Sequence, residues 1–172
     1  MNTFALIAVV AVFIYSGVAF AQVGEPIKKF IRSKLVKDFA FVLDSTLDTG
    51  PFSTTPGQEK RIYKSKDSRY TIEVIADKEG KNIILEELSY PLSEGQDPND
   101  ERCVTEFVSA ATGDKVNKED FLRLYKETRR SQGKKMELIE SGFIVSVEVY
   151  RHALYKELNV TVGKFTYTSK WW

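Results

Sequence analysis

The chain contains one cysteine, Cys103, and one histidine, His152, so only these two residues could form a thiol–imidazole catalytic pair. Such a pair needs the imidazole beside the thiol and a third group that orients the ring. The sequence supplies both residue types but nothing that places them together. We therefore predict that Cys103 is a buried thiol within a strand and that His152 is an exposed turn residue. An intermolecular disulfide through Cys103 is the alternative.

An acidic stretch over residues 94–101 contains the residue types that bind calcium. An EF-hand loop starting at Asp97 would need Gly at its sixth position and Glu at its twelfth, where this chain has Arg102 and Val108. Phosphate-loop, nucleophile-elbow, zinc-protease and dinucleotide-binding motifs are also absent from the sequence. The sequence therefore predicts a protein that is not an enzyme and holds no cofactor or metal. A hydrolase that uses a carboxylate pair is the enzymatic alternative, since such pairs have no readable spacing.

Charge and composition narrow the class of partner. The 172 residues include 25 Lys and Arg against 24 Asp and Glu, a net charge of +1, without the basic block that nucleic-acid binding requires. Hydrophobic residues make up 42% of the chain, which is enough for one folded core. We predict a protein partner or self-association, and no nucleic acid.

The N-terminus resembles a secretory signal. Residues 4–21 carry no charge and end in Ala19-Phe20-Ala21, a small-x-small pattern that predicts cleavage before Gln22. Removal of a signal peptide over residues 1–21 leaves 151 residues, and we expect the protein to be secreted. A membrane anchor is the alternative, because an uncharged, mostly apolar run of 18 residues can just cross a bilayer.

Export makes two kinds of modification site usable. Asn159-Val160-Thr161 is a glycosylation sequon, which predicts a glycan on Asn159. Pairs of basic residues predict proprotein processing after Arg61, or after Arg130 or Lys135, if these sites are exposed and flexible. The pair at Lys60-Arg61 is expected to be the most exposed of them.

Apolar residues at helical spacing from Pro26 to Asp44 predict an amphipathic helical segment over residues 22–47. This helix packs on its own domain or, as the alternative, lies on a membrane surface, which is the only membrane contact we predict. Turn-forming residues predict a linker over 48–60. A second helix is expected between the N-cap Asn117 and Gly133.

The rest of the chain is dominated by alternating β patterns, including a hairpin turn at Asp77-Lys78-Glu79-Gly80. The fold class that follows is α+β, an antiparallel sheet with an N-terminal helix and a second helix packed on it. This domain spans residues 61–172, and its C-terminal part, about 142–168, is rich in β structure. The strands are predicted over residues 70–74, 82–88, 103–108, 142–150 and 158–168.

Residues 62–132 resemble a BRICHOS domain, as found in proproteins with an N-terminal hydrophobic segment and a β-prone C-terminal region. The similar stretches are Tyr70-Thr71-Ile72-Glu73-Val74, Asn82-Ile83-Ile84-Leu85, Cys103-Val104-Thr105 and Glu119-Asp120-Phe121-Leu122-Arg123-Leu124-Tyr125. The second cysteine of the family has no counterpart. The resemblance implies a chaperone-like domain that shields a β-prone segment, here the chain's own residues 143–172.

The function we predict is therefore that of a secreted, non-enzymatic protein that acts by protein binding, as a BRICHOS-like proprotein. The alternative is an extracellular structural or matrix component that associates through the β-rich tail and Cys103. The two β-prone stretches after residue 142 also fit ordinary strands of the same domain, and this simpler interpretation is favoured for the fold.

Overall fold

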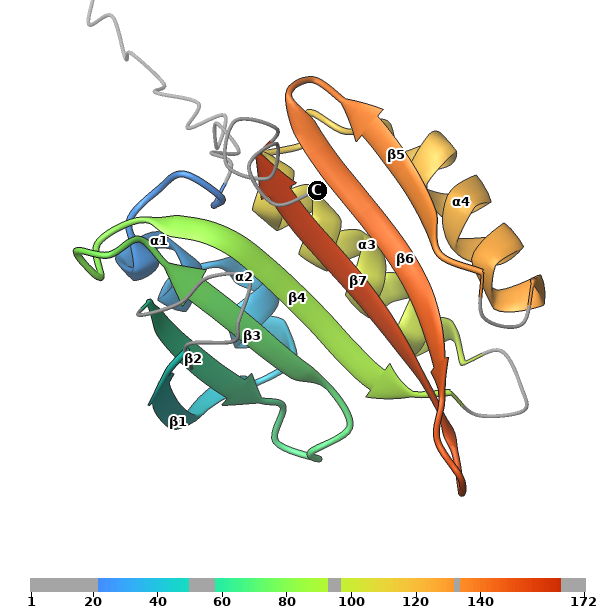
Figure 1. Cartoon of the computed structure of the whole chain (residues 1–172), viewed down its shortest axis with the longest axis horizontal. Coiled ribbons are helices and arrows are strands. Elements are labelled where there is room, and N and C mark those ends of the chain that lie inside the picture. Colours follow the sequence, from blue (N-terminus) through green and yellow to red (C-terminus); the bar gives the residue numbers. More distant parts are fainter. Residues whose placement is uncertain (1–21, 50–57, 93–96, 132–133, 165–172) are drawn as a thin grey trace, which may run out of the picture.

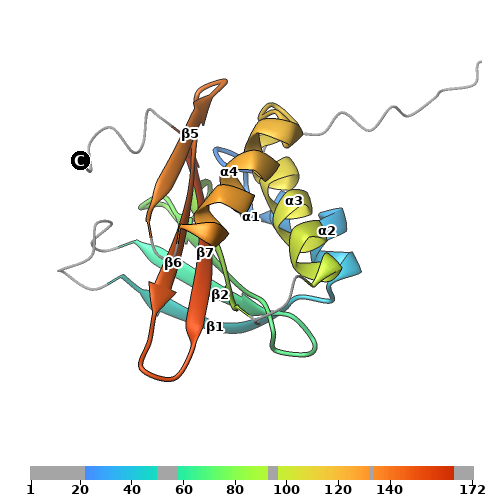
Figure 2. The same ribbon diagram turned by 90° about the vertical axis from the view of Figure 1, so that its right-hand side faces the viewer.

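The computed structural model describes residues 22–49, 58–92, 97–131 and 134–164. They form one seven-stranded antiparallel sheet whose helices all lie on the same face (Figures 1 and 2). The predicted α+β class is confirmed. The predicted signal peptide and most of the predicted linker lie outside the described residues. Within them, no helix is both long and apolar enough to cross a membrane.

The sheet is built from two antiparallel halves that meet at its centre. The strand order is β1-β2-β3-β4-β7-β6-β5, so β7 pairs with β4 on one side and with β6 on the other. The favoured interpretation of the β-rich tail is thus confirmed, because β6 and β7 are integral strands. The strands are β1 (Val42–Asp48), β2 (Glu59–Lys64), β3 (Thr71–Ala76), β4 (Ile83–Pro91), β5 (Met136–Glu140), β6 (Phe143–Arg151) and β7 (Lys156–Lys164).

The hairpin turn predicted at residues 77–80 is confirmed. The Gly80 amide donates to the Asp77 carbonyl at 2.8 Å, and Gly80 has a φ of +66°, the left-handed conformation that glycine adopts most easily. Strand β2, which lies on the other side of β3, pairs with β1. These two strands flank the segment predicted to be a linker. The N-terminal segment therefore belongs to the same sheet as the rest of the chain.

Cys103 does not lie in a strand; the prediction of a strand over 103–108 is wrong. These residues form the middle of helix α3 (Pro98–Thr112). Asp97 caps the helix by accepting from the Asn99 amide at 2.8 Å, and Gly113 ends it with a φ of +64°. The β-branched residues of this stretch are overridden by strong helix-start and helix-stop signals, and the apolar face of the helix packs against the sheet.

The N-terminal helix is shorter than predicted. It is divided into α1 (Ile27–Ile31) and α2 (Lys34–Asp38), because Ser33 begins a new helix by accepting from the Val36 amide at 3.3 Å. The prediction that helix continues to Asp44 is wrong, since the chain turns at Ala40 and enters β1. The second predicted helix, α4 (Lys118–Arg130), has the predicted N-cap Asn117.

Candidate functional site

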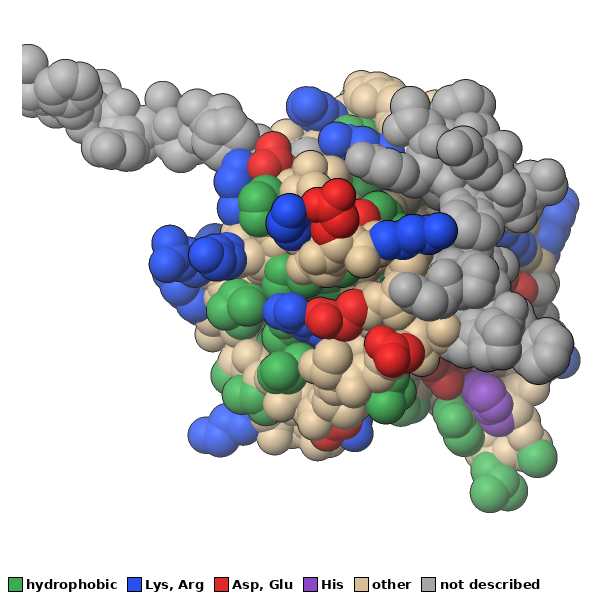
Figure 3. Space-filling view, turned by 60° about the vertical axis from the view of Figure 1, so that its left-hand side comes forward, with side chains coloured by type: hydrophobic (Ala, Val, Ile, Leu, Met, Phe, Trp, Pro, Cys, Tyr) green, Lys and Arg blue, Asp and Glu red, His purple; other side chains and the backbone are tan. Residues whose placement is uncertain are grey.

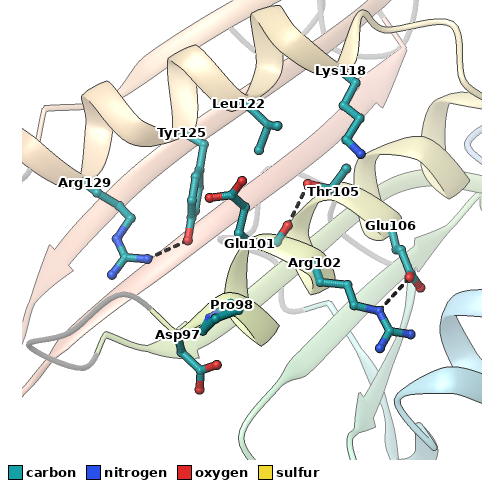
Figure 4. Close-up of a pocket in the computed structure, with 10 residues that line it drawn as sticks. All are labelled: Asp97, Pro98, Glu101, Arg102, Thr105, Glu106, Lys118, Leu122, Tyr125 and Arg129. Atoms are coloured by element: carbon teal, nitrogen blue, oxygen red, sulfur yellow. Dashed lines mark hydrogen bonds and ion pairs between the residues drawn. The ribbon is translucent and has the colours of Figure 1, made fainter.

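A cleft of about 510 Å³ lies between α3 and α4, on the side of the helix layer away from the sheet (Figure 4). Leu122 and Tyr125 of α4 and Thr105 of α3 line it between charged side chains. Three of these charged residues are acidic and three are basic: Asp97, Glu101, Glu106, Arg102, Lys118 and Arg129.

Most charges in the cleft are neutralised by local partners. Arg102 Nε lies 3.0 Å from a carboxylate oxygen of Glu106, and Lys126 Nζ lies 3.4 Å from one of Glu101. Asp97 pairs with Arg69 at 3.1 Å. Since acid and base alternate and pair, the cleft has no strong field of either sign that would select a charged ligand.

A buried polar network lies beneath this cleft and is centred on Asp100, whose side chain has no exposed surface. Its Oδ1 accepts from Arg69 at 2.8 and 3.1 Å and from the Tyr70 hydroxyl at 2.9 Å. Burial, together with the hydrogen bond to this carboxylate, raises the pKa of Tyr70 above its ordinary value. Tyr70 therefore remains a neutral donor, and the network fastens α3 to the sheet.

A second buried bond joins the sheet to α4. The hydroxyls of Tyr90 and Tyr125 lie 2.8 Å apart. Arg129 Nη1 donates to the Tyr125 oxygen at 2.8 Å (Figure 4). Burial is the largest cause that raises the pKa of both tyrosines. These groups are satisfied by one another, so we assign them a structural role.

Glu86 is the main exception among buried polar groups. It lies on the helix-covered face of β4, between Val74 of β3 and Val162 of β7, and its exposed fraction is 0%. Neither carboxyl oxygen has a hydrogen-bond partner, and burial alone raises the pKa to about 8. A neutral carboxylic acid at neutral pH follows from this environment.

The opposite face of the sheet is covered by none of the described helices and carries a row of polar side chains around Glu87. Asn159 Nδ2 donates to Glu87 Oε1 at 2.9 Å, and Thr161 pairs across from Glu87. Burial and the neighbouring Glu73 raise the pKa of Glu87 to about 7. Both polar residues of the sequon thus contact a carboxyl in a central strand, and glycosylation of Asn159 stays a prediction.

The structure does not bring Cys103 and His152 together. Cys103 is fully buried in α3, and burial raises the pKa of its thiol above the ordinary value. His152 is exposed, as predicted, in the β6–β7 turn, with its Nε2 3.1 Å from Glu157 Oε2. An intermolecular disulfide through Cys103 would first require α3 to open, because a thiolate attacks only when it is accessible.

The predicted processing sites differ in accessibility. The expectation that Arg61 is exposed is wrong, since it lies half-buried in β2, paired between β1 and β3. Arg130, at the end of α4, and Lys135, just before β5, are both exposed. Of the predicted sites, Arg130 and Lys135 therefore have the exposure that processing needs.

The two edges of the sheet differ in how they are protected. Edge strand β5 has five residues, two of them Glu, and Glu140 accepts from the Asn117 amide at 2.9 Å. Edge strand β1 has seven residues. Two of its apolar side chains are more than half exposed, Val42 (63%) and Leu43 (54%), and Leu47 is 49% exposed. Edge β1 is therefore the less protected of the two.

The sequence predictions missed both Glu86 and edge β1. The β-branched and apolar content of Phe41-Val42-Leu43 is a usable strand signal. These residues also continue the helical spacing that precedes them, and the predicted helix therefore included them. For Glu86 the usable signal is alternation, because Glu86 shares a face with Leu88 and Tyr90, whereas Glu87 shares the other face with Ser89.

Comparisons of the chain with protein-family models, with curated proteins and with solved structures find no match.

Proposed function

We propose that the protein is exported and acts without catalysis, by binding an extended, β-prone segment of another protein at edge β1. The observation that carries this proposal is the exposure of Val42, Leu43 and Leu47 on a strand that pairs, among the described strands, with β2 alone. An edge strand presents unpaired N–H and C=O groups, and an added strand would satisfy them.

The side chains of β1 fit this mode of binding. Val42 and Leu47 face the open side, opposite Lys64 and Lys60, whereas Leu43 lies opposite the buried Tyr63. Within the described part of the chain, each has a cross-strand neighbour from β2 on one side only, so a strand on the other side would supply the missing neighbours. Such pairs stabilise a sheet by roughly 0.2–1 kcal/mol each.

The resemblance to BRICHOS domains supports the same class of activity, since those domains shield β-prone segments. The chain's own β-prone stretches are strands β6 and β7. Strand β6 is already paired with β5 and β7, and strand β7 is already paired with β4 and β6. The client we propose is therefore a segment of a different chain. The structural-matrix alternative requires Cys103 to reach another chain, and no geometry favours it because Cys103 is buried.

The experiment uses a synthetic peptide of residues 143–151, a β-prone sequence with one Glu and one Arg, as the client. We expect the mature protein to delay fibril formation by this peptide, measured by thioflavin fluorescence. Val42→Glu combined with Leu47→Glu places each new carboxylate opposite a lysine of β2, and should weaken peptide binding about tenfold, from the loss of two apolar cross-strand pairs.

The matched control is Ile139→Lys, which puts a charge at a similarly exposed position of edge β5, near Glu137. It should leave inhibition unchanged. Equal loss in both variants, or wild-type inhibition by the β1 variant, would refute binding at β1. A concentration-dependent dimer that only the β1 variant abolishes would identify a second copy as the occupant.

Export is tested separately by mass spectrometry of the native protein. A mature N-terminus at Gln22 is the expected result. A chain that retains Met1 and stays with the membrane fraction would instead identify residues 4–21 as an anchor.

A further inference from the structure

The hairpin between β6 and β7 projects beyond the body of the sheet (Figures 1 and 2). Strand β5 pairs with β6 only as far as Val147, and β4 ends at Pro91, opposite Glu157 of β7. Residues 150–156, which we call the hairpin tip, therefore have little support from neighbouring strands.

The hairpin tip exposes large apolar and aromatic side chains. Leu154 is 96% exposed, and Tyr155 and Tyr150 are 49% and 45% exposed. Figure 3 shows hydrophobic and histidine side chains gathered on this projection. Leu154 makes almost no contact with its own chain and therefore contributes little to folding.

The charges of the hairpin tip have one sign. Residues 150–156 contain two cations, Arg151 and Lys156, and no acidic residue. The nearest acid along the chain is Glu157, which is bonded to His152 at 3.1 Å. The tip therefore combines an apolar apex with a cationic pair, and Glu157, opposite Tyr150, lies directly behind that pair.

The hairpin tip is also held in one conformation. The His152 and Tyr155 rings stack with their centroids 4.4 Å apart, and the His152 amide donates to the Tyr155 carbonyl at 2.9 Å. Arg151 and Lys156 are directly paired across the hairpin. Because the turn is ordered before it binds, docking loses little conformational entropy.

We propose that the hairpin tip docks on an anionic membrane surface, with Leu154 entering the boundary between headgroups and acyl chains. The Arg151–Lys156 pair lies behind the apex, roughly two residue steps of about 3.3 Å away. Basic side chains at that depth reach lipid phosphates, and the tyrosine rings next to them occupy the interfacial layer. This inference is independent of peptide binding at edge β1.

A membrane is favoured over a protein partner because of the order of groups along the hairpin. A convex apex fits a fluid surface directly, whereas a protein would need a matching pocket. From apex to base the side chains run apolar, aromatic and cationic, which matches the depth profile of an anionic bilayer.

The experiment is co-sedimentation of the mature chain with vesicles of phosphatidylcholine alone or with 30% phosphatidylglycerol. We expect binding only to the anionic vesicles, weakened by salt. Leu154→Asp should weaken binding at least tenfold. Arg151→Gln with Lys156→Gln should weaken it about 25-fold, roughly fivefold per cation.

Ile139→Asp is the matched control, an exposed apolar residue on edge β5 that should leave binding unchanged. Circular dichroism and thermal unfolding of Leu154→Asp should match the wild type, since Leu154 is 96% exposed. Wild-type binding by Leu154→Asp, or equal binding to both vesicle types, would overturn the proposal. Failure of the wild type to pellet with anionic vesicles at low salt would also overturn the proposal, and it would favour a protein partner.

Discussion

Replacing Glu86 with Met should stabilise the protein and remove much of its pH dependence. The folded state raises the pKa of Glu86 from the ordinary 4.5 to about 8. Because the folded pKa is raised, the folded state binds the proton more tightly than the unfolded state does. The stability is therefore fully present below pH 4.5 and is lost as the pH rises towards 8.

The size of the effect follows from the shift. Each pKa unit corresponds to about 1.4 kcal/mol, so the loss over the whole window is about 5 kcal/mol. At pH 7, keeping Glu86 protonated costs about 3 kcal/mol. Met is unbranched, similar in length and apolar, so it fits beside Val74 and Val162 without that cost. A gain of about 3 kcal/mol corresponds to a rise of roughly 6–12 °C in Tm for a chain of this size.

The assay is urea unfolding at pH 5, 7 and 9 for the wild type, Glu86→Met and the control Glu148→Gln on the open face. The difference in unfolding free energy between Glu86→Met and wild type should grow from pH 5 to pH 9. Glu87 titrates near 7 with the same sign, but it is common to both proteins and cancels in the difference. A difference that stays constant with pH would refute the reasoning.

Two further predictions concern the cysteine and the α4–β5 connection. Cys103 should react with a thiol reagent roughly a hundredfold or more slower in the folded protein than in urea, because it is buried and its pKa is raised; rapid labelling at pH 8 would contradict its burial. Limited trypsin should cut first between Arg130 and Lys135, and gel filtration should show the two fragments still associated, because β7 remains paired with β4. Fragments that separate in native buffer would show that this pairing cannot hold the halves together.

The parts of the fold that could be predicted are those where local and tertiary preferences agree. The turn at residues 77–80 has a Gly where a positive φ is required, and alternating strands flank it. Helix α4 has its N-cap at Asn117 and basic residues in its last turn. In α3 the two preferences conflict, since Cys103–Val108 favours a strand locally while Asp97 and Gly113 fix a helix.

Alternation with Leu88 and Tyr90 favours an inward Glu86, but the irregularity in register that accompanies this placement could not be predicted. Ala76 pairs with Ile83 while Ile75 pairs with Leu85, so the pairing shifts by one residue just before Glu86. A shift of one residue exchanges the two faces of a strand. Without it, Glu87 and not Glu86 would point towards the helices. The sequence shows two adjacent acids and contains no local signal for this shift.

The positions of edge β1 and the hairpin tip make the two proposals separable. Four strand spacings of about 4.8 Å place β1 roughly 19 Å from β7 across the sheet, and the tip projects along the strand direction past β5. A chain docked through Leu154 would leave the peptide groups of β1 free to pair. Leu154→Asp should therefore leave fibril inhibition unchanged, and the Val42→Glu, Leu47→Glu variant should still bind anionic vesicles. Loss of both activities in either variant would mean that one surface, or a common unfolding, accounts for them.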